Sequence, residues 1–198
     1  MTRVVLVPGV LALLPEYAGI EDPVAELRAA CLSAVSWLGS SEVTVLADPQ
    51  GARVAEYLLE VVSVSTRSLA LAAQPPGVGD SGRSGAEAAG VSRQALEGLP
   101  QPSEGADAAY LVVGNGSARR TEKAPGFLDE RAATFDAELG ERLRAGRFEV
   151  DEGLAAELLA SVSGIAELGR LVSDVGPARV DYDDDPYGVQ YWVMRWSS

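Results

Sequence analysis

The stretch Tyr110-Leu111-Val112-Val113-Gly114-Asn115-Gly116-Ser117 joins four apolar residues directly to a glycine-rich turn. A short apolar run with β-branched residues is typical of a strand that is buried on both faces of a parallel sheet. The glycines after it predict a turn that requires positive φ. Because binding sites of α/β sheets collect at the carboxyl ends of strands, this stretch predicts an α/β protein with a site in the turn.

The segments around this stretch alternate between strand and helix patterns. Upstream, residues 3–7 and 42–47 predict strands, and residues 22–39 and 52–60 predict helices. The first of these helices has Asp22 as its N-cap, Pro23 at its first position and Gly39 at its end. Downstream, residues 178–180 and 189–196 predict two strands joined by the polar turn 181–188. The predicted fold is therefore a three-layer α/β/α sandwich with a mostly parallel central sheet. Two further helices are predicted from apolar residues at helical spacing, one closed by Gly146 and one bent at Gly164: Leu128, Ala132, Phe135, Leu139 and Leu143; then Leu154, Leu158, Val162, Ile165 and Leu168.

Length and composition indicate a single domain over residues 1–198. Hydrophobic residues make up 47% and charged residues 23%, and no apolar run approaches the roughly 20 residues that span a bilayer. The net charge of -13 opposes binding to nucleic acid, and the first residues do not resemble a signal peptide, so a cytoplasmic protein is expected. Residues 74–104 are rich in glycine and proline and predict a mobile excursion with one helix near residues 91–96.

Cysteine and aromatic residues carry two smaller expectations. Cys31 lies on the apolar side of a predicted helix, which favours an inert core thiol. The large aromatic residues are predicted to lie in the hydrophobic core or to line a pocket. Because they cluster near the C-terminus, a sheet edge that is buried in a homodimer is an alternative. They are Trp37, Tyr187, Tyr191, Trp192 and Trp196.

The glycine turn and the cations after it form the first candidate site. Backbone N–H groups and a hydroxyl beside three cations are suited to a small anionic ligand. The alternative is a tight turn whose cations neutralise nearby carboxylates, such as Asp129, Glu130 or those of residues 181–185. The candidate ligand-binding residues are Gly114, Asn115, Gly116, Ser117, Arg119, Arg120 and Lys123.

Carboxylates near two predicted strand ends form a second candidate site, for a divalent metal. Asp48, Asp183 and Asp184, with Asp181 and Asp185 beside them, offer the oxygen ligands that Mg²⁺ or Ca²⁺ prefers. The alternative is a solvated acidic turn, because no regular calcium-loop spacing is present. No histidine occurs in the chain, so Ser-His-Asp and Cys-His catalysis are excluded.

Three segments together resemble the LigB-like family, which is related to class III extradiol dioxygenases, and in particular its short actinobacterial members. The segments cover residues 5–16 with 26–30, residues 114–132, and residues 182–193. The most specific is the central one: Gly114-Asn115-Gly116-Ser117-Ala118-Arg119-Arg120, followed by Lys123-Ala124-Pro125-Gly126-Phe127-Leu128-Asp129-Glu130-Arg131-Ala132.

The resemblance implies a LigB-like fold, but it does not imply the family's iron chemistry. Active members hold ferrous iron with two histidines and a carboxylate. This chain has Pro8-Gly9 and Asp48-Pro49 where the histidines are expected, so no iron cofactor and no catalytic residue are assigned. The resemblance therefore implies a pseudoenzyme or a repurposed protein that binds a small ligand or a protein partner. The alternative is an enzyme that uses a carboxylate-bound divalent metal, or no metal, in the same strand-end cleft.

Overall fold

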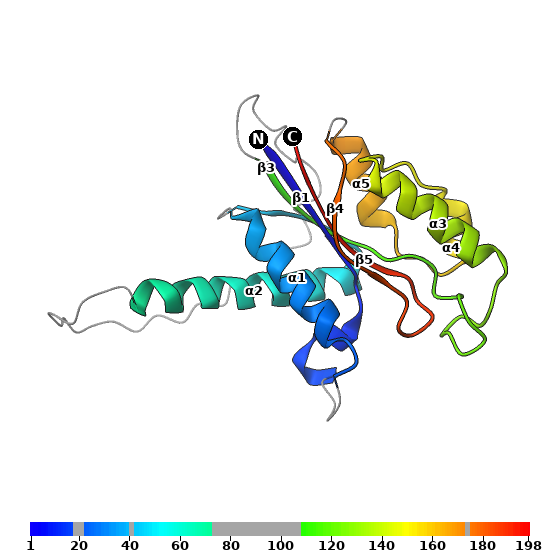
Figure 1. Ribbon diagram of the computed structural model, residues 1–198, viewed down its shortest axis with the longest axis horizontal. Coiled ribbons are helices and arrows are strands. Elements are labelled where there is room, and N and C mark those ends of the chain that lie inside the picture. The colour runs from blue at the N-terminus through cyan, green and yellow to red at the C-terminus, as the bar shows by residue number, and fades with distance from the viewer. Residues whose placement is uncertain (18–21, 40–41, 73–107, 173–174) are drawn as a thin grey trace, which may run out of the picture.

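The central sheet has five strands in the order β2-β3-β1-β5-β4 in the computed structural model of the chain (Figure 1). β1 (Thr2–Val7) and β2 (Thr44–Leu46) both pair in parallel with β3 (Ala108–Val113). β5 (Tyr191–Ser197) is antiparallel to β1 and to β4 (Arg179–Asp184). The predicted α/β class is confirmed, and the sheet is mixed: three neighbouring parallel strands are extended by an antiparallel hairpin.

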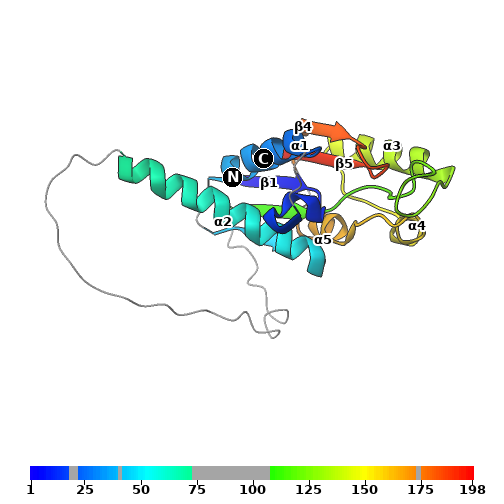
Figure 2. The ribbon, with the colours of Figure 1, turned by 90° about the horizontal axis from the view of Figure 1, so that it is seen from below.

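The structure describes residues 1–17, 22–39, 42–72, 108–172 and 175–198, with the side chains of α2 described as far as residue 63. The predicted excursion at 74–104 lies outside these residues. Helices cover both faces of the sheet (Figures 1 and 2). α1 (Ala25–Leu38) and α2 (Pro49–Ala72) lie on one face. α3 (Arg131–Arg144), α4 (Glu152–Glu157) and α5 (Ser163–Leu171) lie on the other. Two short 3-10 helices, Leu11–Leu13 and Pro15–Tyr17, follow β1.

Each face of the sheet has its own hydrophobic core because successive side chains of a strand point to opposite faces. In β1, Val4 and Leu6 pack toward α3, α4 and α5, whereas Val5 and Val7 pack toward α1 and α2. All four side chains are at most 1% exposed. This burial explains why β1 reads as a continuous apolar run and not as an alternating one.

Several predicted boundaries differ from those observed. α1 begins at Ala25, because Asp22 accepts a hydrogen bond from the Val24 N–H in a turn before the helix. Its end at Gly39 is confirmed, with φ of 60°. α2 is longer than predicted, and its far end extends beyond the sheet in both views (Figures 1 and 2). The bent helix predicted around Gly164 is instead two helices, α4 and α5, separated by residues 158–162.

Two further corrections concern positions near the candidate sites. The predicted polar turn 181–188 is wrong in its first half, because residues 181–184 belong to β4 and pair with β5. Leu128 was predicted on the buried face of a helix, but it precedes α3 and is half exposed. The hairpin itself is confirmed.

The large aromatics belong mostly to the core. Trp192 and Trp196 are at most 2% exposed and pack under α3, which removes their contribution to the argument for a dimer edge. Cys31 is fully buried, so its expected place in the core is confirmed, and this burial raises the pKa of its thiol to about 12, which disfavours the reactive thiolate. Among the described helices, none combines the length and the apolar character needed to cross a membrane.

Candidate functional site

The loop after β3 uses its backbone N–H groups inside the protein. Every N–H group from Gly114 to Arg120 donates to an acceptor of the chain, so an anion would have to displace an existing hydrogen bond. The acceptors, in order, are the carbonyls of Val7, Ser161 and Gln190, the Asp136 carboxylate, the Leu158 carbonyl, the Ser117 hydroxyl and the Gly188 carbonyl. The geometry therefore favours the alternative reading of this loop as a structural turn.

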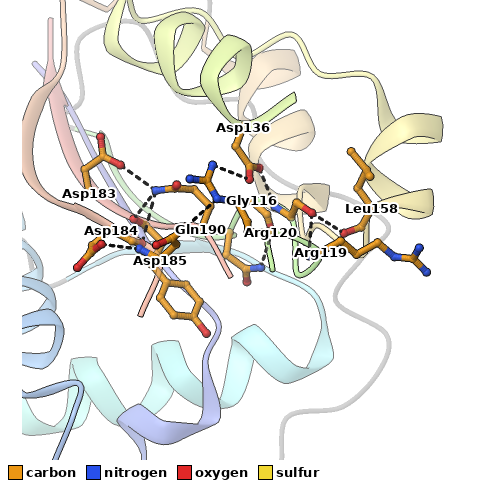
Figure 3. A network of polar contacts seen from close by, with 12 residues as sticks. Gly116, Arg119, Arg120, Asp136, Leu158, Asp183, Asp184, Asp185 and Gln190 are labelled. Atoms are coloured by element: carbon orange, nitrogen blue, oxygen red, sulfur yellow. Dashed lines mark hydrogen bonds and ion pairs between the residues drawn. The ribbon is translucent and has the colours of Figure 1, made fainter. Parts of the chain in front are cut away.

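Ser117 is the centre of this turn and is fully buried. Its hydroxyl donates to the Leu158 carbonyl oxygen at 3.0 Å and accepts from the Arg119 N–H at 3.0 Å. The first hydrogen bond ties the loop to the segment after α4, and the second lies within the loop itself (Figure 3). The hydroxyl thus joins two segments of the chain and is not presented to a ligand.

Glycine is required in this loop by close packing and not by its backbone angles. Among the described glycines only Gly39, Gly146 and Gly188 have positive φ, so the predicted positive-φ turn is wrong. A Cβ atom on Gly116 would lie 2.4 Å from Asp136 Oδ1 and 2.9 Å from the Trp192 ring. The absent side chain lets α3 and β5 approach the loop on this side.

Asp136 of α3 is the buried charge to which this loop is attached. Its side chain is 1% exposed, and its Oδ1 atom accepts the Ser117 N–H at 2.7 Å. Its Oδ2 atom has a longer contact, 3.5 Å, with Arg120 Nη1. Burial raises the pKa of Asp136 to about 6, although the Ser117 N–H and the Arg120 guanidinium both favour the carboxylate. The group therefore titrates near the physiological range.

Arg120 connects this carboxylate to the C-terminal hairpin. Its side-chain Nε atom donates to Asp185 Oδ2 at 2.8 Å, and its backbone N–H donates to the Gly188 carbonyl oxygen. Gln190, which is buried, donates through Nε2 to Asp183 Oδ1 at 2.8 Å (Figure 3). The loop after β3, α3 and the hairpin are thus joined by one polar network.

A pocket of about 280 Å³ lies beside this network, between α3 and the hairpin. Arg144 of α3 and Asp183 of β4, which form an ion pair, both line it. The eight lining residues are Arg120, Asp136, Ala137, Glu141, Arg144, Asp183, Gln190 and Trp192. A larger pocket of about 430 Å³ lies between residues 146–152 and α5, and it contains none of the residues predicted as a site.

The three predicted cations of the loop have different surroundings. Arg120 reaches the pocket, as described above. Arg119 approaches Asp129 at 3.9 Å and lies against Gly126, where a Cβ atom would be 2.6 Å from Arg119 Cγ. Lys123 is exposed and has no hydrogen bond or ion pair within the described part of the chain. The structure therefore brings one of the three cations to the pocket.

The carboxylates predicted as metal ligands lie at opposite edges of the sheet. Asp48 follows β2, while Asp183 and Asp184 end β4, so four strand spacings, about 19 Å, separate them. Asp48 accepts the Gly51 N–H through Oδ1 and the Ser161 hydroxyl through Oδ2, both at 2.7 Å, so it caps α2 and holds the segment before α5. Within the described residues, no three carboxylate or thiol groups gather in a way that would hold a metal ion.

The strand end where the family resemblance expects an iron ligand is closely packed. A Cβ atom on Gly9 would lie 3.2 Å from Val113 Cγ1 and 3.5 Å from Gly51 Cα. A Cβ atom on Gly51 would lie 2.7 Å from the same Val113 atom. The residues present do not fit an iron centre, since they offer neither imidazole ligands nor space for them at this position.

Asp136, Glu141, Arg144 and Gln190 were not predicted as site residues from the sequence. A signal for Asp136 was present: it is four residues from both Ala132 and Gly140, so it falls on the buried face of α3. A charged residue on an apolar helical face indicates a paired or functional group. Glu141, Arg144 and Gln190 have no such signal, because only the approach of the hairpin to α3 makes them neighbours.

Comparison of the chain with models of protein families, with curated proteins and with solved structures gives no match.

Proposed function

We propose that this chain is a LigB-like protein that has lost the family's iron chemistry and binds a small polar ligand in the pocket between α3 and the β4–β5 hairpin. The proposal includes the three-layer LigB-like sandwich expected from the sequence. Two hydrophobic cores, one on each face of the mixed sheet, are compatible with that architecture.

The observation that carries the proposal is a buried carboxylate at the pocket wall, one of whose oxygens has only a long hydrogen bond. Asp136 Oδ1 has a short hydrogen bond, but Oδ2 has only the contact of 3.5 Å with Arg120. A buried carboxylate is costly unless its oxygens are hydrogen-bonded. A polar ligand that reaches Oδ2 from the pocket would add a shorter hydrogen bond to the long one from Arg120.

The pocket replaces the glycine loop as the candidate binding surface. The loop's N–H groups are all engaged, so the predicted anion site formed by Gly114–Ser117 with Arg119 and Lys123 gains no support from the contacts. Arg120 is shared by both hypotheses, because it follows the loop and also lines the pocket. The loop contributes by fixing Asp136 and Arg120 in place.

The experiment is a titration of the ¹⁵N-labelled protein with single small polar compounds, followed by two-dimensional NMR in the presence of EDTA. Compounds that shift the amide signals of Ala137, Glu141 and Gln190 support the proposal. Ala137→Phe places a large side chain at the exposed lining of the pocket and is expected to abolish these shifts. Ala29→Phe is the matched control, because Ala29 is an exposed position of α1, which covers the opposite face of the sheet.

Two outcomes would contradict the proposal. Shifts that are absent in the presence of EDTA and appear when Mg²⁺ replaces it would favour the alternative, an enzyme with a carboxylate-bound metal. The absence of any shift at the pocket with cationic, anionic and neutral compounds would favour a protein that acts only through a macromolecular partner.

A further inference from the structure

Building on the proposed function, we infer that the ligand of this pocket carries a primary ammonium group, which donates a hydrogen bond to Asp136 Oδ2 and faces Glu141. The inference concerns the charge of the ligand. It reverses the expectation of an anionic ligand that the arginines and the lysine suggest in the sequence.

Negatively charged side chains outnumber positively charged ones at the pocket wall. Three carboxylates, those of Asp136, Glu141 and Asp183, line the pocket against two guanidinium groups, Arg120 and Arg144. The Glu141 carboxylate has no hydrogen bond or ion pair with the described residues, and Asp136 Oδ2 has only its long contact with Arg120. A carboxylate oxygen accepts up to two hydrogen bonds, so both groups retain acceptor capacity.

Both arginines of the pocket already have carboxylate partners. Arg120 donates to Asp185 at 2.8 Å, and Arg144 is paired with Asp183. An anion in the pocket would have to compete with these aspartates while lying near the negative charges of Asp136 and Glu141. Like charges a few ångströms apart in a partly buried site repel each other much more strongly than they do in water. An ammonium group instead supplies the charge that the pocket lacks.

The remaining wall of the pocket suits a short apolar chain on the ligand. Trp192 is 2% exposed and lines the pocket together with Ala137. Gly140 lets the Arg144 guanidinium and the indole lie close to the α3 backbone, because a Cβ atom there would lie 3.0 Å from Arg144 Nη1 and 3.5 Å from Trp192 Cζ2. An indole also attracts a nearby cation. The volume of about 280 Å³ limits the ligand to a small molecule.

The test uses two probes of equal chain length and opposite charge, n-butylamine and sodium butyrate, at pH 7.5, fixed ionic strength and excess EDTA. Butylamine is expected to shift the amide signals of Ala137, Glu141 and Gln190 with a millimolar dissociation constant, and butyrate is not. Asp136→Asn keeps an acceptor for the Ser117 N–H but removes the charge, and is expected to weaken butylamine binding at least tenfold. Glu141→Gln changes an exposed residue of α3 that the fold does not need, and is expected to weaken binding about threefold.

The control variant is Glu56→Gln, which removes one negative charge from the exposed side of α2 and is expected to leave binding unchanged. If butyrate or a neutral compound binds in the pocket and butylamine does not, the ammonium inference is overturned while the proposed function stands. If Asp136→Asn and Glu141→Gln both bind butylamine as the parent does, the inference is likewise overturned. If no compound of any charge shifts the pocket signals, the proposed function itself fails.

Discussion

Asp136 makes the stability of this protein depend on pH in an uncommon direction. Most carboxylates have a lowered pKa in the folded state, as does Asp129, whose hydrogen bond with the Arg131 guanidinium holds its pKa at about 2. The pKa of Asp136 is instead raised to about 6 by burial, against the pull of Ser117 N–H and Arg120 and with a small push from Asp185. The two aspartates therefore respond to acid with opposite signs.

Asp136→Asn is expected to remove a pH-dependent loss of stability between about pH 4 and pH 7. Below the pKa that Asp136 has in the unfolded chain, it is protonated in both the folded and the unfolded state. As the pH rises from there to about 6, the unfolded chain ionises freely, whereas the folded protein must keep the proton or hold a buried charge, so folding becomes less favourable. The free energy of unfolding should fall by about 1–3 kcal/mol over this interval in the parent. Urea unfolding at each pH measures the free energy of unfolding. Glu56→Gln is the control, which should keep the same slope of this free energy against pH. An unchanged slope in Asp136→Asn would contradict the assignment.

Ser117 tests whether the glycine loop is structural. Ser117→Ala leaves the Leu158 carbonyl and the Arg119 N–H without their hydroxyl partner in a buried place, which costs about 1–3 kcal/mol. Urea unfolding should show this loss, whereas Ser63→Ala, at an exposed position of α2, should change the free energy of unfolding by less than about 0.5 kcal/mol. A Ser117→Ala variant as stable as the parent, with altered affinity for phosphate, would restore the anion site predicted from the sequence.

At the scale of elements, the sequence predicted best where burial acts on a whole strand. β1 and β3 read as apolar runs because both of their faces are covered, and the C-terminal hairpin was found from two strand patterns around a turn. The site was predicted less well, since the pocket is formed by residues of α3 and the hairpin that are about 50 positions apart in the sequence. Periodicity describes one element at a time and does not show which two elements will meet.

Gly164 shows how the packing of α5 constrains a helical glycine. A Cβ atom there would lie 2.3 Å from the Leu46 carbonyl oxygen and 2.8 Å from that of Val113, so α5 would have to move away from β2 and β3. Gly164→Ala is expected to destabilise the protein by about 1–3 kcal/mol despite the better helix propensity of alanine, and thermal or urea unfolding measures this loss.

Gly153 of α4 is the matched control for this prediction. A Cβ atom at this position meets only Asp151 Oδ1, at 3.4 Å, which is ordinary contact. Gly153→Ala should therefore leave stability unchanged or raise it by up to about 1 kcal/mol. Equal effects of the two substitutions would indicate that α5 does not pack against the strand ends as described.

At the scale of the molecule, the net charge of -13 affects any experiment with cations. Many arginines of the described residues are paired with carboxylates, but pairs at exposed positions contribute little and leave the excess of negative charge in place. Salt screens this self-repulsion, with a Debye length of about 10 Å at 0.1 M. Every added cation is therefore expected to raise the thermal midpoint to some extent, whether or not a metal site exists.

Comparison at equal ionic strength separates screening from a metal site. Asp48 is engaged by Gly51 and Ser161, and it lies about 19 Å across the sheet from Asp183 and Asp184, so these carboxylates do not share one ion. Mg²⁺, Mn²⁺, Fe²⁺ or Ca²⁺ should then raise the thermal midpoint no more than NaCl of the same ionic strength. Mass spectrometry of protein purified without a histidine tag should find metal well below one ion per chain. One retained ion per chain, with an additional shift that EDTA reverses, would instead support the metal-dependent enzyme, because specific binding stabilises the folded state beyond any effect of screening.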